Sequence, residues 1–162
     1  MALIPEVAKD VLSRYWDFTV PVDLEGMAAR AGFDVSYDRS MHQVVSGSCE
    51  VVDGVGRIVI NAMEPRVRQR FTLAHELAHL FLGHTEGGKK FRDDPKTFTD
   101  PYAFNIEEVD ANRLGAAILM PAPAIEHFIV KKGVTSVTEL AQTFAVSKAA
   151  MEIRLKALGW KR

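Results

Sequence analysis

One apolar run near the middle of the chain, residues 70–82, restricts the fold more than any other segment. It holds two histidines four positions apart, His75 and His79, with Glu76 beside the first. A helix turns once in about 3.6 residues, so both imidazoles would lie on one face and could hold one metal ion. The other side chains are apolar nearly all round, which predicts a buried helix. Because burying two histidines and a carboxylate is costly without partners, we predict a metal-binding helix rather than merely packed or solvated histidines.

A catalytic metal site of this kind usually takes three protein ligands and leaves the fourth position to water. His84 is the nearest further candidate, but on a continuing helix it would point away from the pair. Next to Gly83, it is more typical of a helix C-terminus, where a protonated imidazole suits the helix dipole. Glu76 is placed to act as the general base for a water on the metal.

A second helix, predicted over residues 106–120, supplies a better third ligand in Glu108. The small residues at positions 111 and 115 share a stripe with it and would let the first helix approach closely. This packing would place the Glu108 carboxylate opposite the imidazoles, with Asn112 one turn further on as an acceptor for a histidine N–H. The alternative is that the acidic residues of this first turn have no role in metal binding. This alternative explains the neighbouring acidic residues better than it explains Glu108.

The group that would stabilise an oxyanion in the reaction is less constrained by the sequence. Tyr102, in the loop before the Glu108 helix, and His127, in a helix after Pro121, have suitable side chains. Residues of both types are more often ordinary packing or surface residues, so both readings stay open.

Short elements precede the metal-binding helix and predict an α+β fold. Asp23 is placed to cap a helix that Gly32 ends. Helices are predicted over residues 5–15 and 23–31, and β-branched extended runs over residues 33–37, 44–52 and 57–61. Residues 53–56 would join the last two runs as a hairpin. We therefore expect a small antiparallel sheet packed on the pair of metal-site helices.

Between the two metal-site helices, residues 85–104 show no sustained periodicity. Loops of this length in compact domains are either functional or disordered. We expect either a mobile rim that contacts substrate or plain disorder.

The last third of the chain is predicted to be helical. Residues 137–155 have the spacing of a helix-turn-helix, with Ser147 capping the second helix. Over residues 131–162 seven basic side chains stand against two acidic ones, which makes DNA binding conceivable. However, residues 148–151 lack the Arg, Asn and Gln that read bases, which favours a structural or docking role. We predict a core of residues 1–125 and a C-terminal helical subdomain of residues 126–162, packed as one compact unit.

Length and composition agree with one enzyme domain, since 162 residues suffice for one sizeable core. The net charge of -1 gives no signature of polyanion binding, and no early apolar stretch has the length of a signal peptide or membrane span. The single cysteine, Cys49, excludes an intramolecular disulfide and fits a reducing compartment. We expect a cytoplasmic location without membrane association.

Several segments resemble the ImmA/IrrE family of zinc metallopeptidases. They are residues 68–79, 108–112 and 117–121, with further similarity at 21–23, 32–35, 58–61 and 140–155. The resemblance implies a zincin-like core in which His75, His79 and Glu108 are the metal ligands and Glu76 is the catalytic base. It also implies an endopeptidase that cuts a partner repressor carrying a helix-turn-helix domain, and so relieves repression in a stress or mobile-element response.

Other functions remain open from the sequence. The chain could be a non-proteolytic, zinc-containing regulator that binds DNA or a repressor, or the toxin partner of a toxin-antitoxin pair. Zinc is the expected metal, although manganese, iron or cobalt would accept a similar set of ligands. The oligomeric state cannot be read from the sequence.

Overall fold

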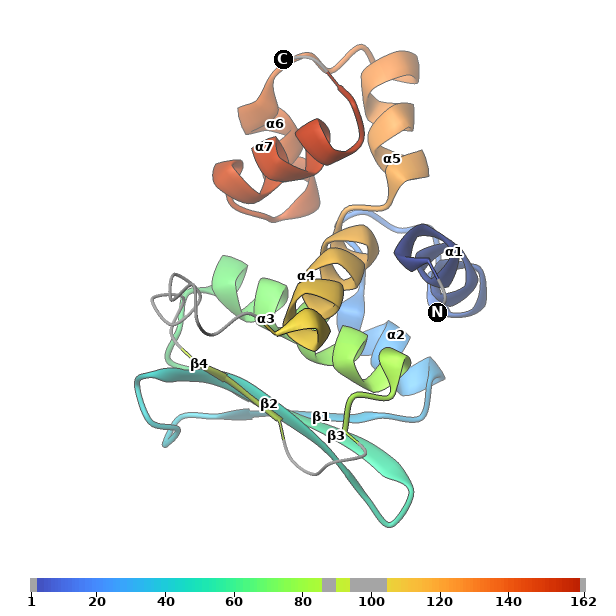
Figure 1. Cartoon of the computed structure of the whole chain (residues 1–162). Helices are drawn as coiled ribbons and strands as arrows, with labels where there is room; N and C mark the ends of the chain where they lie inside the picture. The colour runs from blue at the N-terminus through green and yellow to red at the C-terminus, as the bar shows by residue number, and fades with distance from the viewer. Residues whose placement is uncertain (1–2, 86–89, 94–104, 161–162) are drawn as a thin grey trace.

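The computed structural model describes residues 3–85, 90–93 and 105–160 (Figure 1). The elements in chain order are α1 (Ile4–Tyr15), α2 (Leu24–Arg30), β1 (Asp34–Asp38), β2 (Val45–Val52), β3 (Val55–Asn61), α3 (Arg66–Leu82), β4 (Lys90–Asp93), α4 (Ile106–Leu119), α5 (Ala122–Glu126), the π-helical turn η2 (His127–Lys131), α6 (Val137–Phe144) and α7 (Lys148–Ala157). Figure 1 shows α2 and α3 on one face of the sheet, α4 across α3, α1 beside α4, and α5 to α7 at the far end. The α+β class is therefore confirmed.

The predicted hairpin is confirmed in β2 and β3, which pair antiparallel through the register Val52↔Val55. Its two turn residues, Asp53 and Gly54, have φ values of 51° and 79°, the left-handed conformations that a tight hairpin turn between twisted strands favours. The prediction of an antiparallel sheet is wrong in one respect, because β1 pairs with β3 in parallel and the strand order is β1-β3-β2-β4.

The reason for the mixed sheet lies in β3, which carries the buried Ile58 and Ile60 and takes a central position between two neighbours. The chain between β1 and β2 crosses over β3, so that β1 lies beside β3 rather than beside β2. Strand β4, within the segment predicted to lack regular structure, pairs antiparallel with β2. The rest of that predicted rim, residues 86–89 and 94–104, lies outside the described residues.

Helix α3 is the central element, and its middle is buried on all sides as predicted, including His75, Glu76 and His79. It ends at Gly83, whose φ of 73° is left-handed, in agreement with the predicted C-terminus. Near its start, Arg66 contacts Glu25 of α2 and Tyr37 of β1, and the tyrosine hydroxyl donates a hydrogen bond to the Glu25 carboxylate. This polar cluster fixes α2, β1 and α3 relative to one another.

Helix α4 lies directly against α3, at the small residues that the sequence singled out. A Cβ atom added at Gly115 would lie 3.2 Å from the carbonyl carbon and oxygen of Ala74 and 3.2 Å from the Cα of His75. Such a contact is tighter than most Cβ contacts, so a side chain here would require the α3 backbone to shift by a few tenths of an ångström. The close contact between the helices therefore occurs at the level of the first histidine.

The C-terminal helices pack on the same core. Ser136 and Ser147 cap α6 and α7, each accepting a hydrogen bond from a backbone N–H three residues further on, as predicted for Ser147. Leu140, Phe144, Met151 and Leu155 are buried and belong to the core cluster that includes α3 and α4. The division at residue 125 and the helix-turn-helix assignment stay predictions.

Among the described residues, no single helix is both long and apolar enough to span a membrane. One bent pair of helices, Ile106–Leu119 with Ala122–Lys131, would meet that requirement by length and composition alone.

Candidate metal centre

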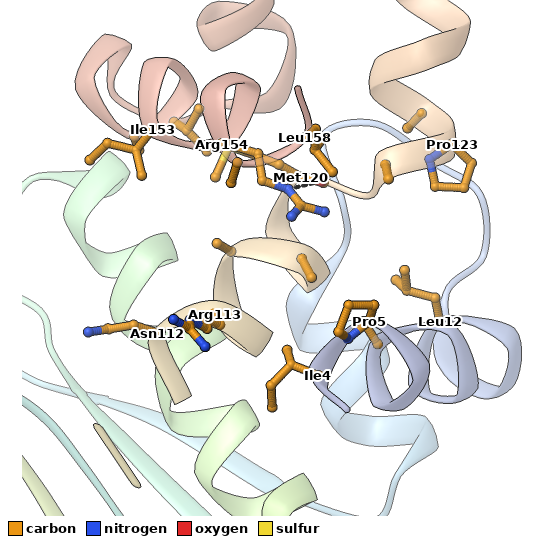
Figure 2. Close-up of a pocket in the computed structure, with 18 of the residues that line it drawn as sticks. Ile4, Pro5, Leu12, Asn112, Arg113, Met120, Pro123, Ile153, Arg154 and Leu158 are labelled. Atoms are coloured by element: carbon orange, nitrogen blue, oxygen red, sulfur yellow. Dashed lines mark hydrogen bonds between the residues drawn. The ribbon is translucent and has the colours of Figure 1, made fainter. Parts of the chain in front are cut away.

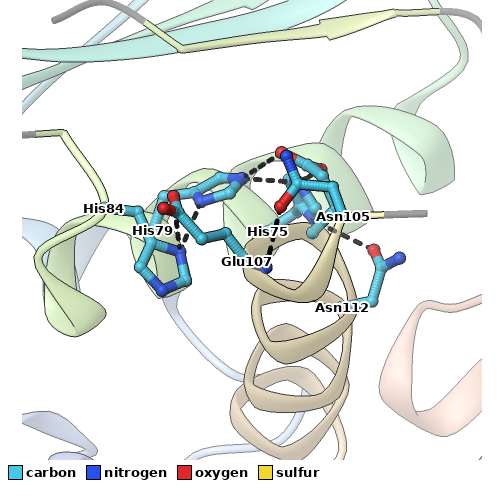
Figure 3. Close-up of polar contacts among 7 residues, drawn as sticks. His75, His79, His84, Asn105, Glu107 and Asn112 are labelled. Atoms are coloured by element: carbon cyan, nitrogen blue, oxygen red, sulfur yellow. Dashed lines mark hydrogen bonds and ion pairs between the residues drawn. The ribbon is translucent and has the colours of Figure 1, made fainter. Parts of the chain in front are cut away.

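The structure brings His75, His79 and Glu108 together, with their candidate ligand atoms all within 4.8 Å of one another. One carboxylate oxygen of Glu108 lies 2.9 Å from Nε2 of His75, and the other lies 2.9 Å from Nε2 of His79. The two Nε2 atoms are 3.0 Å apart (Figure 3). Both histidines are almost wholly buried, and Glu108 reaches them from the first turn of α4.

The second nitrogen of each imidazole is also engaged, and for His75 the partner indicates which ring nitrogen carries the proton. Nδ1 of His75 lies 2.8 Å from the amide oxygen of Asn112. Because an amide oxygen only accepts, Nδ1 of His75 donates, and the neutral ring keeps a lone pair on Nε2. Nδ1 of His79 lies 3.0 Å from Nδ1 of His84. Both Nε2 atoms lie against the Glu108 carboxylate.

Such convergence of two buried imidazoles and a carboxylate favours a cation. Burial by itself would raise the pKa of Glu108, but the hydrogen bonds and charges of His75 and His79 outweigh it and hold this pKa well below its usual 4.5. The carboxylate is thus ionised. Contacts of 2.9 Å between it and the nitrogens are attractive only if the imidazoles carry protons or a cation is shared among the three groups. Two imidazoles and one carboxylate are the ligand set of several catalytic zinc sites, so the residues fit a divalent metal.

Sequence reasoning did not assign His84 to this cluster, and the structure shows why. The expectation that it points away assumed a continuing helix, whereas α3 ends at Leu82 and the left-handed Gly83 turns the chain back. The backbone N–H of His84 donates to the carbonyl of His79, and its ring lies against the His79 ring. A carboxylate oxygen of Glu107 lies 3.8 Å from Nδ1 of His84. The Gly-His pair directly after the helix was the available signal.

The remaining predicted residues have different positions. Glu76 is buried in the same turn of α3 as His75, where its predicted role as base stays a prediction. His127 is exposed at the start of η2, and its ring packs against Phe128 with 5.6 Å between centroids rather than against the metal cluster. Tyr102 lies outside the described residues.

A helix with two histidines four residues apart and a buried glutamate between them, facing a carboxylate from a second helix, is an arrangement typical of the metal sites of metallopeptidases. The model of the IrrE N-terminal-like domain, Peptidase_M78, matches residues 28–156. The chain therefore belongs to this family, which confirms the resemblance to ImmA/IrrE proteins and implies a divalent metal.

Two known proteins are similar to this chain. The radiation response metalloprotease IrrE of Deinococcus radiodurans is 34% identical over 96 residues, which cover 57% of this chain and 28% of that protein. The solved structure of a Mycobacterium tuberculosis transcriptional regulator has a TM-score of 0.66 at 16% identity, over 98% of this chain and 48% of that one. The second likeness concerns the fold alone. The chain spans less than half the length of either protein.

Proposed function

We propose that this chain is a zinc-dependent endopeptidase that cleaves a partner protein, namely a transcriptional repressor with a helix-turn-helix domain. Cleavage would relieve repression in a stress or mobile-element response, and a repressor substrate implies action in the cytoplasm. The observation that carries the proposal is the convergence of two imidazole Nε2 atoms and one carboxylate beside the buried Glu76. Membership of a metallopeptidase family supports it.

In this proposal each residue has one task. His75 and His79 hold the metal through Nε2, and Glu108 holds it through its carboxylate. A divalent cation, when bound, supplies a Lewis acid that makes the hydrolytic water more acidic. Glu76 accepts the proton of the attacking water and delivers it to the leaving amine nitrogen. A site that served structure alone would have no need for this buried carboxylate and would more often close its fourth position with Cys or His.

Zinc is the proposed metal because two imidazoles and one carboxylate are a ligand set that catalytic zinc commonly takes. Manganese or another divalent ion would accept similar ligands, so metal analysis of the purified chain decides between them.

The decisive experiment compares wild type with Glu76→Gln, and with His75→Ala and Glu108→Ala. New protein N-termini in the source cell are identified by mass spectrometry, and the metal content of each purified chain is measured. We expect Glu76→Gln to keep the metal and lose cleavage by about 10²- to 10⁴-fold, the usual contribution of a general base. The two ligand variants should lose both metal and cleavage. Glu139→Gln, an exposed change of the same chemistry, is the control.

A helix-turn-helix repressor fragment that appears with wild type and not with Glu76→Gln would support the proposal. Cleavage at the wild-type rate by Glu76→Gln would refute the role of Glu76. If metal is bound and no cleavage depends on Glu76, a non-proteolytic regulator becomes the better description. DNA affinity with a steep dependence on salt, unchanged by Glu76→Gln, would then identify DNA as its partner.

A further inference from the structure

A large groove lies on the side of α4 toward the C-terminal helices, with a volume of about 1960 Å³. Helices α1 and α4 form one wall, and α5 and α7 form the other (Figure 2). Asn112, which accepts the hydrogen bond from His75, also lies on its lining. The groove therefore adjoins the metal centre through one side chain of α4.

The lining carries large apolar side chains that are left in water. Of the ten exposed large hydrophobic side chains among the described residues, four line this one groove: Leu3, Phe18, Val67 and Ile153. Phe18 is 77% exposed and Ile153 is 71% exposed. Clustered apolar side chains of this kind mark an interaction surface rather than the scattered exposure that is normal for a soluble protein.

The loop after α1 holds Phe18 in a strained conformation. Its φ of 67° is left-handed, which is a genuine outlier for a bulky residue. Trp16 donates from its indole to the carbonyl of Thr19, and Asp17 accepts from the backbone N–H of Thr19, so the loop is fixed on both sides of Phe18. The centroids of the Phe18 and Trp16 rings lie 4.8 Å apart. Strain retained at an exposed aromatic residue points to a binding role.

The charges along the groove are mostly positive, although the whole chain has a net charge of -1. Four basic side chains line it, Lys9, Arg68, Arg113 and Arg154, against the single acidic Asp110. Arg68 is already paired with Glu64 at 2.8 Å, so Lys9, Arg113 and Arg154 carry the positive charge that faces a partner. Arg154 reaches from α7 and donates to the carbonyl of Met120 at the end of α4, as Figure 2 shows. A partner for this surface should combine an apolar face with acidic residues.

The size of the groove favours a protein segment over a small molecule. Pockets for small ligands usually enclose about 300 to 1000 Å³, which is well below the 1960 Å³ of this groove. A helix about 10 Å in diameter occupies roughly 120 Å³ per residue, so the groove could take about sixteen residues, or about four turns. A helix in a groove is a common mode of peptide recognition.

We propose that this groove docks an acidic amphipathic helix of the substrate protein, outside the segment that is cleaved. The apolar face of that helix covers Phe18 and Ile153, and its acidic residues lie beside Arg113 and Arg154. The identity of the partner as substrate rests on the function proposed above, whereas the binding of such a helix does not.

A designed peptide tests the binding directly. A fluorescein-labelled helix of about sixteen residues carries Leu at positions i, i+3, i+4 and i+7 and Glu on the flanks, and a second peptide carries Lys in place of every Glu. Binding to the full chain is measured by fluorescence anisotropy, with Glu76→Gln in parallel. We expect the acidic peptide to bind at least about tenfold more tightly than the basic one, with no effect of Glu76→Gln.

Matched variants locate the binding. Ile153→Asp should weaken binding of the acidic peptide about tenfold, because it places a carboxylate on the apolar lining of the groove. Val130→Asp is the control, because Val130 is 59% exposed on η2 and is not on the lining. Arg113→Glu should also weaken binding, whereas Arg39→Glu, on an exposed residue outside the lining, should not. Equal affinity for the two peptides, or equal effects of Ile153→Asp and Val130→Asp, would overturn the proposal. So would dimerisation of the chain that Ile153→Asp abolishes while no peptide binds.

The substrate assignment has its own test once a repressor fragment has been found. Ile153→Asp should raise KM for the intact repressor and leave kcat unchanged, and Val130→Asp should change neither. Unchanged KM in Ile153→Asp would overturn the assignment to substrate even if the peptide binds. If wild type produces no fragment at all, the proposed peptidase function fails, and the peptide result still decides whether the groove binds an acidic helix.

Discussion

The hydrogen bond between Asn112 and His75 allows a sharp prediction of metal affinity. Asn112→Leu replaces the amide with an apolar side chain of similar size and removes the acceptor that lies 2.8 Å from Nδ1 of His75. His75 is 1% exposed, so its N–H would stay without that partner at a cost of about 1 to 3 kcal/mol. The ring can avoid this cost by moving its proton to Nε2, but the lone pair that should bind the metal is then lost.

Either outcome lowers metal affinity by a similar amount. A cost of about 1 to 3 kcal/mol corresponds to a loss of roughly 5- to 150-fold, which agrees with the 10- to 100-fold typical of residues that orient metal ligands. The assay is a zinc titration of Asn112→Leu in competition with a fluorescent chelator at neutral pH. Asn112→Asp keeps an acceptor in place and should bind zinc at least as tightly as wild type.

Two results would refute this reasoning. Wild-type affinity in Asn112→Leu would mean that the contact does not orient His75. Equal losses in the leucine and aspartate variants would mean that the effect comes from disturbed packing of α4 rather than from the missing acceptor.

Three further changes have expected outcomes. Gly115→Ala should destabilise the fold by about 1 kcal/mol in urea unfolding and weaken zinc binding, because a Cβ 3.2 Å from the α3 backbone pushes the two helices apart. A gain in stability, as the higher helix propensity of alanine alone would give, would contradict this. Ala145→Gly should stabilise by about 0.5 to 1 kcal/mol, since Ala145 has a left-handed φ of 54°, whereas Ala149→Gly within α7 should destabilise. Burial raises the pKa of Glu25, but hydrogen bonds from its tyrosine and arginine partners outweigh it and lower this pKa below 4.5. The stability it contributes is therefore present above about pH 4.5 and lost as the pH falls further, so the difference between wild type and Glu25→Gln, up to about 1 kcal/mol at neutral pH, should vanish in acid.

Local features could be predicted from the sequence because they depend only on residues that are close together in the chain. The four-residue spacing of His75 and His79 places both on one helical face whatever surrounds them, and Gly115 marks where a neighbouring helix can approach. Asp53 and Gly54 could be assigned to a hairpin turn for the same reason. These features together allowed the convergence of Glu108 on the histidines to be anticipated from one chain.

Other features depend on contacts between distant segments. Which strand lies beside β1 is decided by the burial of Ile58 and Ile60 in β3, and no periodicity within β1 reveals it. Strand β4 is short and gains its conformation from pairing with β2. The position of His84 depends on one left-handed residue, Gly83, which reverses the chain after α3. The groove beside α4 arises from helices that are far apart in the sequence, so no local pattern predicts it.

Helix α4 and its C-terminal residue contact two other helices, α3 and α7. Glu108 faces the histidines of α3, Gly115 lies against the α3 backbone, and the Met120 carbonyl accepts from Arg154 of α7. Since the proposed ligands come from two helices that meet only in the folded chain, the free energy of metal binding would become free energy of folding. Metal shortage would therefore reduce more than the activity of each molecule. It would also reduce the number of folded molecules that escape cellular proteolysis, so that the abundance of the protein follows the supply of its metal.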